Sequence, residues 1–163
     1  MPDTRQDGEM IMGCDIHLYI EKKKNDKWIP AQGFMQTDED ALPDVPHHDK
    51  FSQRQYCLFG YLAGVRCPGL QHFKTNGFPM DASRPVKLQY KKMGVDAHTP
   101  SYLTLFELQT VDWHTDKIDC GYGQGPVILR EAFPAFYDLV FWLQSYDYTC
   151  RTDEIRIVFW FDN

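Results

Sequence analysis

The sequence lacks the features that would direct the protein to a membrane or to an oxidising compartment. Its five cysteines contain no C-x-x-C spacing, and an odd number cannot pair completely within one chain. The first eleven residues are polar and contain no apolar segment typical of a signal peptide. No run of about eighteen apolar residues occurs, so a spanning helix is not expected. We therefore predict a cytoplasmic protein with reduced thiols and no membrane partner.

Positive charge is also scarce. Lys and Arg number 17 against 23 Asp and Glu, which gives a formal net charge of −6. Proteins that bind long nucleic acid usually carry a clear basic face, so this balance argues against such a partner. The two basic runs, Lys22 to Lys24 and Lys91-Lys92, are expected to be solvated charge at a strand end or in a loop, with a local phosphate contact as the alternative.

Core-forming residues are plentiful. Apolar residues make up 43% and aromatic residues 15% of the 163 positions, which excludes a globally disordered chain. This length fits one compact domain. Because Met12 resembles a second start, we expect residues 1–11 to form a disordered extension and residues 12–163 to form a single domain.

Alternation of apolar and polar residues predicts strands near both ends of the sequence. Cys14 to Lys24 alternates, and the turn-forming pair Asn25-Asp26 leads into a hairpin partner at Lys27 to Ala31. Glu154 to Asn163 also alternates, and it is so apolar that we expect it in the centre of the sheet. The N- and C-terminal strands are therefore predicted to be neighbours.

Helical spacing predicts about three helices. Apolar residues recur at this spacing in Gln55 to Val65 and again from Pro134 onward. Thr99-Pro100-Ser101 is typical of a helix start with proline in its first turn. Cys67 to Val95 is expected to be a long loop, with a short strand around Val86 to Tyr90 as an alternative. The predicted fold is α+β: a small, mostly antiparallel sheet covered by about three helices.

The first chemical signal is an Asp-x-His spacing. On a strand, residues two apart share a face, so Asp15 and His17 can direct an oxygen and a nitrogen at one divalent ion. The alternatives are a solvated strand face with an Asp–His hydrogen bond, and acid–base chemistry without a metal. Asp96 and His98 precede the predicted helix start, where backbone amides favour an anion. Three of the six histidines show this spacing: His17, His98 and His114, the last of which is expected to cap a helix end.

Other polar residues are weaker candidates. Arg66 directly follows an apolar helix, so it either ends that helix or clamps a phosphate or carboxylate. Asp81 is typical of a turn or helix cap, and its alternative role is a third metal carboxylate. His47-His48-Asp49 is expected to be a solvated loop, although vicinal histidines can complete a site. The glycines at 121, 123 and 125 lack the dinucleotide-binding spacing.

Several segments resemble an uncharacterised family of bacterial and phage proteins. The resemblance rests on G-C-D-I-H at Gly13 to His17, Y-C-L-F-G-Y-L-A-G-V-R at Tyr56 to Arg66, Gly77 to Ser83, Asp96 to Leu108 and R-I-V-F-W-F-D-N at Arg156 to Asn163. It implies no particular activity. The Asp15-x-His17 motif is also similar to the first motif of calcineurin-like metallophosphoesterases, but the other motifs of that superfamily are absent from this sequence.

These observations favour a metal-assisted hydrolase that acts on a phosphoester or nucleotide. Asp15, His17, Asp96 and His98 would hold Zn, Mn or Mg, which lowers the pKa of a bound water. Arg66 would steady the anion, and Asp81 is the further catalytic candidate. The partner would be a small phosphorylated substrate. The alternative hypothesis is a non-catalytic phage or bacterial protein that modulates a host protein through exposed aromatics and long loops.

Overall fold

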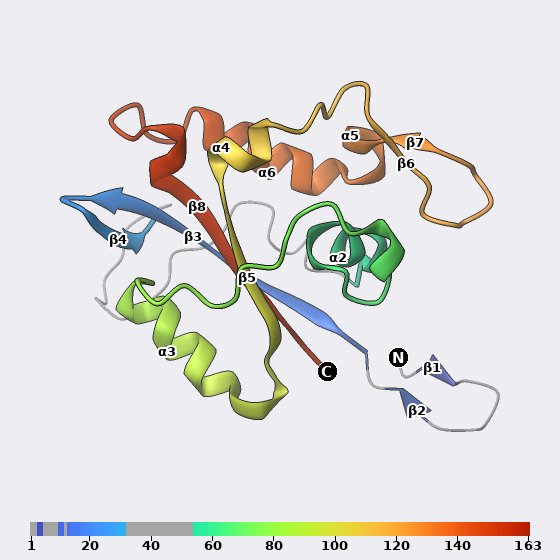
Figure 1. The fold of residues 1–163 in the computed structure, drawn as a ribbon, viewed down its shortest axis with the longest axis horizontal. Coiled ribbons are helices and arrows are strands. Elements are labelled where there is room, and N and C mark those ends of the chain that lie inside the picture. The colour runs from blue at the N-terminus through green and yellow to red at the C-terminus, as the bar shows by residue number, and fades with distance from the viewer. Residues whose placement is uncertain (1–2, 5–9, 12, 32–53) are drawn as a thin grey trace.

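The computed structural model describes residues 3–4, 10–11, 13–31 and 54–163 (Figure 1). The predicted His47-His48-Asp49 candidate lies outside these residues. In chain order the elements are β1 (Asp3–Thr4), β2 (Met10–Ile11), β3 (Asp15–Lys24), β4 (Lys27–Pro30), α2 (Tyr56–Ala63), η1 (Pro68–Leu70), α3 (Arg84–Met93), η2 (Gly94–Asp96), β5 (His98–Thr104), α4 (Leu105–Gln109), β6 (Lys117–Ile118), β7 (Val127–Ile128), α5 (Leu129–Ala132), α6 (Pro134–Gln144), η3 (Thr152–Glu154) and β8 (Ile155–Asp162).

The central element is a four-stranded antiparallel sheet with the order β4-β3-β8-β5. The predicted α+β fold is confirmed, as are the neighbouring N- and C-terminal strands and the central position of β8. Asn25 and Asp26 form the β3–β4 turn with φ values of 51° and 60°, a conformation that suits a two-residue hairpin. The short strands β1 and β2 lie within the predicted extension and pair with each other.

One face of the sheet carries the main hydrophobic core. Because side chains alternate along a strand, the even-numbered apolar residues of β3 and the odd-numbered ones of β8 point to the same side. They pack with apolar residues of α2, α4 and α6, which Figure 1 shows beside the sheet. Representative members, all almost fully buried, are Ile16, Leu18, Leu58, Phe59, Leu108, Phe136, Leu139, Ile157, Phe159 and Phe161.

The opposite face is covered by α3, where the sequence predicted a loop or a short strand. That prediction was wrong. Val86 is fully buried against Val158 and Trp160 of β8, and Tyr90 and Met93 pack on the same cluster. These three α3 residues are four and three positions apart, which places them on one side of a helix. Three lysines, Leu88 and Gln89 lie between them, so the apolar spacing is not clear in the sequence.

The predicted helix start at Thr99 was also wrong, because His98 to Thr104 forms β5. This strand lies at the edge of the sheet, where a proline such as Pro100 removes no ladder hydrogen bond on the solvent side. The helix begins instead after Thr104, whose hydroxyl accepts from the Glu107 backbone N–H while the Glu107 carboxylate accepts from the Thr104 N–H. This reciprocal cap fixes the strand-to-helix boundary.

Two of the five cysteines are joined, which corrects the prediction that all are reduced thiols. A disulfide links Cys57 on α2 to Cys120, which follows β6, with the two Cα atoms 5.6 Å apart. Cys14, Cys67 and Cys150 remain free thiols. Among the described helices, none is long and apolar enough to cross a membrane.

Candidate functional site

Several of the predicted site residues meet at one end of the sheet. β3 begins at Asp15 and β5 begins at His98, and both strands run antiparallel to β8, which ends at Asp162. The starts of β3 and β5 therefore flank the end of β8. This topology adds two residues that sequence reasoning missed, Asp162 and Asn163, to the predicted Asp15, His17 and His98.

His17 and Asp162 form a close pair across neighbouring strands. The His17 Nε2 atom lies 2.7 Å from Asp162 Oδ2, and both side chains are mostly buried. Asp162 Oδ1 also accepts the backbone N–H of Asp15 at 3.1 Å, which fixes the carboxylate. The His17 ring stacks on Trp160 with ring centroids 6.0 Å apart. The contact with Asp162 thus holds the imidazole through Nε2. Among the residues that the structure describes, none is a hydrogen-bond partner of His17 Nδ1.

Asp15 lies on the same strand face as His17, as predicted. Its carboxylate accepts from Arg54 Nε at 3.0 Å, and both side chains are partly exposed to solvent. The two side chains share this face, and each already contacts a second protein group. Arg54 was not among the predicted site residues, because nothing in the sequence pattern linked it to β3.

Arg66 also reaches this end of the sheet. Its guanidinium lies over the Tyr56 ring at 5.1 Å, and it hydrogen-bonds the thiol of Cys14. The Tyr56 hydroxyl accepts the backbone N–H of Cys14 at 3.2 Å. Burial raises the pKa of Cys14, and Arg66 only partly offsets that rise. The thiol is therefore protonated at neutral pH, which argues against Cys14 as a nucleophile.

His98 meets the same strand ends from the other face. Its Nε2 lies 3.1 Å from Asn163 Oδ1, and its Nδ1 lies 3.0 Å from Thr99 Oγ1. Its ring stacks on Phe161, which belongs to the main core, whereas His17 stacks on Trp160 of the opposite cluster. The two histidines therefore lie on different faces of the sheet.

The predicted metal ligands do not converge. Asp96 is exposed in η2, and His98 lies across the sheet from His17. Over residues 13–31 and 54–163, no group of three or more His, Cys, Asp or Glu side chains is arranged to hold a metal ion. Asp15 and His17 alone keep the shared strand face on which the metal hypothesis was based.

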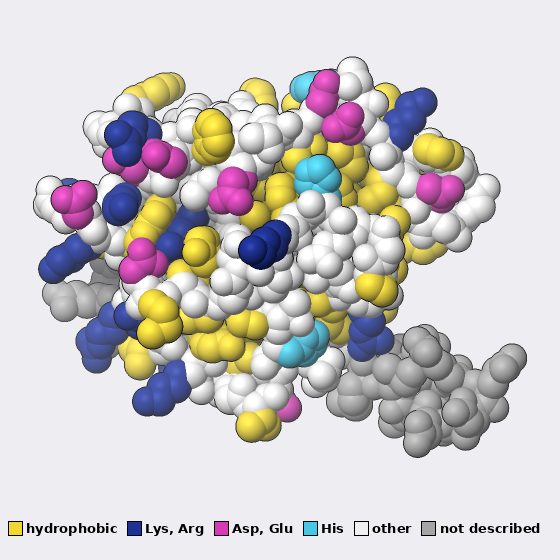
Figure 2. Space-filling view, viewed as in Figure 1, with side chains coloured by type: hydrophobic (Ala, Val, Ile, Leu, Met, Phe, Trp, Pro, Cys, Tyr) yellow, Lys and Arg dark blue, Asp and Glu magenta, His cyan; other side chains and the backbone are white. Residues whose placement is uncertain are grey.

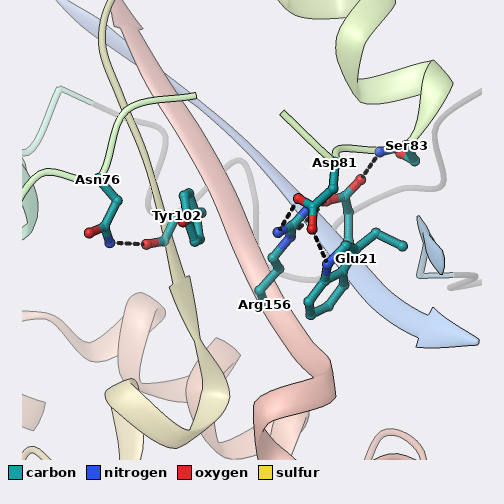
Figure 3. A network of polar contacts seen from close by, with 7 residues as sticks. Glu21, Asn76, Asp81, Ser83, Tyr102 and Arg156 are labelled. Atoms are coloured by element: carbon teal, nitrogen blue, oxygen red, sulfur yellow. Dashed lines mark hydrogen bonds and ion pairs between the residues drawn. The ribbon is translucent and has the colours of Figure 1, made fainter. Parts of the chain in front are cut away.

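Asp81 lies in a separate network, at the exposed side of the buried Arg156 (Figure 3). Arg156 of β8 binds Glu21 of β3 at 2.8 Å and Asp81 at 3.0 Å, and Trp28 Nε1 donates to Asp81. Burial alone would raise the pKa of Asp81, but the interactions with Arg156, a backbone hydrogen bond and the Trp28 hydrogen bond together lower that pKa. Arg156 precedes Asp162 by six residues of strand, or about 20 Å, so Asp81 belongs to a different part of the molecule.

This network fastens α3 to the sheet. The backbone N–H of Ser83, the residue before α3, donates to Glu21 Oε2 at 2.6 Å. The Arg156 guanidinium also lies over the Trp28 ring at 3.9 Å. Glu21 and Arg156 are both buried, so the interactions satisfy charges that water cannot reach. The contacts of Asp81 are those of a structural residue at a helix start.

Comparison with protein-family models, curated proteins and solved structures gives no match. Function is therefore inferred from the geometry at the end of the sheet.

Proposed function

We propose that this protein is a hydrolase of phosphoester or nucleotide substrates in which His17 is the general base. The observation that carries the proposal is the 2.7 Å contact between His17 Nε2 and Asp162 Oδ2. A carboxylate that holds one ring nitrogen fixes the tautomer and orientation of an imidazole, and leaves the other nitrogen to accept a proton. Nδ1 of His17 takes this second role.

The reaction is a water-mediated displacement at phosphorus. His17 Nδ1 accepts a proton from a water whose oxygen forms the new P–O bond. The P–O bond to the leaving group then breaks, and the imidazolium returns the proton to the leaving oxygen. Asp162 stabilises the positive charge on the imidazole while the proton is held there.

Two arginines supply positive charge for the phosphoryl oxygens. Arg54 contacts Asp15, and Arg66 contacts Cys14, so each guanidinium is held near the start of β3. A planar guanidinium can offer two parallel N–H groups to a phosphate. The role predicted for Arg66, steadying an anion, is retained in this proposal.

A divalent ion at Asp15 and His17 stays a prediction. Such an ion would lower the pKa of a bound water. Asp15 would provide one carboxylate ligand and His17 one imidazole ligand, and Arg54 would have to release Asp15. Elemental analysis of the purified protein, together with assays with EDTA and with added Zn, Mn or Mg, separates the metal-assisted form of the hydrolase from the metal-free form.

The decisive assay measures hydrolysis of bis(p-nitrophenyl) phosphate and phosphate release from nucleotides. His17→Gln should lower the rate by about 10² to 10⁴, the range for a positioned acid–base group. Asp162→Asn should lower it less, because the imidazole remains but its orientation is no longer fixed. His114→Gln is the matched control, since His114 belongs to another Asp-x-His pair and its ring contacts Tyr137, away from the end of the sheet.

The proposal is wrong if the wild-type protein hydrolyses none of these substrates, or if His17→Gln leaves the rate unchanged. Circular dichroism and thermal melting of each variant show whether a lost rate reflects a lost fold.

The alternative, a non-catalytic protein that modulates a host partner, has its own supporting observation. Large apolar side chains are exposed on the outer helices, including Phe106 of α4 and Phe141 of α6, and Tyr148 beyond α6 is 92% exposed. A stoichiometric partner that is lost with Phe106→Ser and Phe141→Ser, in a protein without hydrolase activity, would favour this second function.

A further inference from the structure

The outer face of α3 carries only positive charge. Arg84, Lys87, Lys91 and Lys92 are exposed, and the ten-residue helix contains no acidic residue. The spacings from Arg84 are three, seven and eight residues, which gather these side chains on the side opposite the buried Val86. In a protein with a net charge of −6, this face is an exception.

Helix stability does not explain the arrangement. Lys91 and Lys92 lie in the last turn, where positive charge complements the helix dipole, but Arg84 and Lys87 lie in the first turn, where it does not. Arg84 and Lys87 are three residues apart, and Lys87 and Lys91 are four apart, so like charges face each other along the helix. These four positive side chains together do not stabilise the helix, which suggests that they interact with another molecule.

The β3–β4 hairpin extends this positive region. Lys24 and Lys27 are exposed where the hairpin turns, and α3 contacts β4. Figure 2 shows Lys and Arg side chains gathered at the left of the view, over the region that Figure 1 labels β3, β4 and α3. We call these six residues the basic surface: Lys24, Lys27, Arg84, Lys87, Lys91 and Lys92.

The acidic side chains described beside the start of α3 are engaged by Arg156. Glu21 is buried against Arg156, and Asp81 binds the same arginine. Within the described part of the chain, Lys87 and Lys91 have no ion-pair partner. Asp26 is exposed in the turn between Lys24 and Lys27, and Asp147 pairs with Lys22 of β3.

We propose that the basic surface binds an acidic segment of another protein. The row from Arg84 to Lys91 covers seven helical steps, or about 10 Å, which matches a short peptide rather than a long polymer. Residues 84–93 contribute +4 to the net charge of −6, so the rest of the chain carries −10 and repels an extended polyanion. Trp28, the aromatic ring beside the hairpin, has Arg156 and Lys23 over it, so it does not serve as a platform for unpaired bases.

The test is fluorescence anisotropy with a labelled ten-residue peptide of alternating Asp and Glu and, in parallel, with a labelled twenty-nucleotide single strand of DNA. Both probes are titrated with the full chain, as wild type and as the double variant Lys87→Glu, Lys91→Glu. The matched control is the double variant Lys74→Glu, Lys117→Glu. Its two lysines are exposed elsewhere, and it has the same net charge.

The expected result is peptide binding that weakens by at least about tenfold in the α3 variant, or about 1.4 kcal/mol, and by less than about threefold in the control. Added salt should weaken the wild-type affinity, since exposed charges are screened. The inference is overturned if the wild type does not bind the peptide, if both variants lose affinity equally, or if the DNA binds more tightly than the peptide. Thermal melting confirms that all three proteins are folded.

Discussion

Replacing Arg156 with Met tests the buried ion pair that fastens α3 to the sheet. The Arg156 side chain is 3% exposed and that of Glu21 is fully buried, with Arg156 Nη2 2.8 Å from Glu21 Oε1. Met keeps much of the side-chain volume but removes the positive charge. Glu21 would then be a buried carboxylate without its cation, and losing one partner of a buried pair costs about 3 to 5 kcal/mol.

Urea unfolding followed by tryptophan fluorescence measures this loss as a decrease in the free energy of unfolding. For a chain of this length, the same loss corresponds to a melting temperature lower by about 9 to 15 °C. The double variant Glu21→Leu, Arg156→Met removes both charges, so it should recover much of the lost stability. Arg130→Met, at an exposed position of α5, should change the free energy by less than about 0.5 kcal/mol.

Two results would refute this reasoning. The first is a loss of less than about 1 kcal/mol in Arg156→Met, which would mean that Glu21 regains solvent or another partner at little cost. The second is a double variant as unstable as Arg156→Met, which would show that packing against Trp28 matters more than charge compensation.

Three further predictions concern other parts of the fold. Cys57→Ser should lower the free energy of unfolding by about 4 kcal/mol, because the disulfide to Cys120 closes a loop over a sequence separation of 63. Equal urea midpoints for the oxidised and the reduced wild-type protein would contradict this prediction. Hydrogen bonds from Thr149 and the ion pair with Lys22 hold the pKa of Asp147 well below its usual range. The ionised carboxylate therefore stabilises the fold at pH values above the ordinary pKa of an aspartate. The stability advantage of the wild type over Asp147→Asn should therefore be full at pH 7 and shrink as the pH falls below about 4, and a constant difference would refute it. Thr104→Ala should cost about 1 kcal/mol in thermal unfolding, whereas Thr104→Ser should keep the cap; similar losses in both would exclude the hydroxyl as the cause.

The strands at the two ends of the chain could be predicted because one of their faces is buried. Alternate residues of β3 pack into the main core, so the sequence itself shows a period of two. Their adjacency followed from the same pattern, since an apolar C-terminal strand needs a neighbour on each side. Both predictions depended on local periodicity alone.

The errors came where a tertiary neighbour decides the local structure. Val86, Tyr90 and Met93 give α3 a narrow apolar face, and their spacing indicates a helix only because Trp160 lies opposite them. Pro100 suits the first turn of a helix as well as an edge strand, so position in the sheet settles which one forms. In neither segment does the sequence alone contain the deciding contact.

The candidate site also has one part that the sequence predicted and one that it did not. The spacing of Asp15 and His17 placed both side chains on one strand face, and the structure confirms this. Asp162 is 145 residues from His17, and only the antiparallel register of β3 and β8 brings the two side chains to 2.7 Å. Adjacency of the terminal strands alone does not specify this pair, because a shift of register would place another residue beside His17.

By itself, the sequence determined which segments bury one face, and hence the terminal strands, the helices α2 and α6, and the shared face of Asp15 and His17. The tertiary structure decided which polar groups meet, because ion pairs and hydrogen bonds require atoms within about 3 to 4 Å and the chain positions involved are far apart. It separated Asp81 from the sheet end, placed His98 on the opposite face from His17, and joined His17 to Asp162.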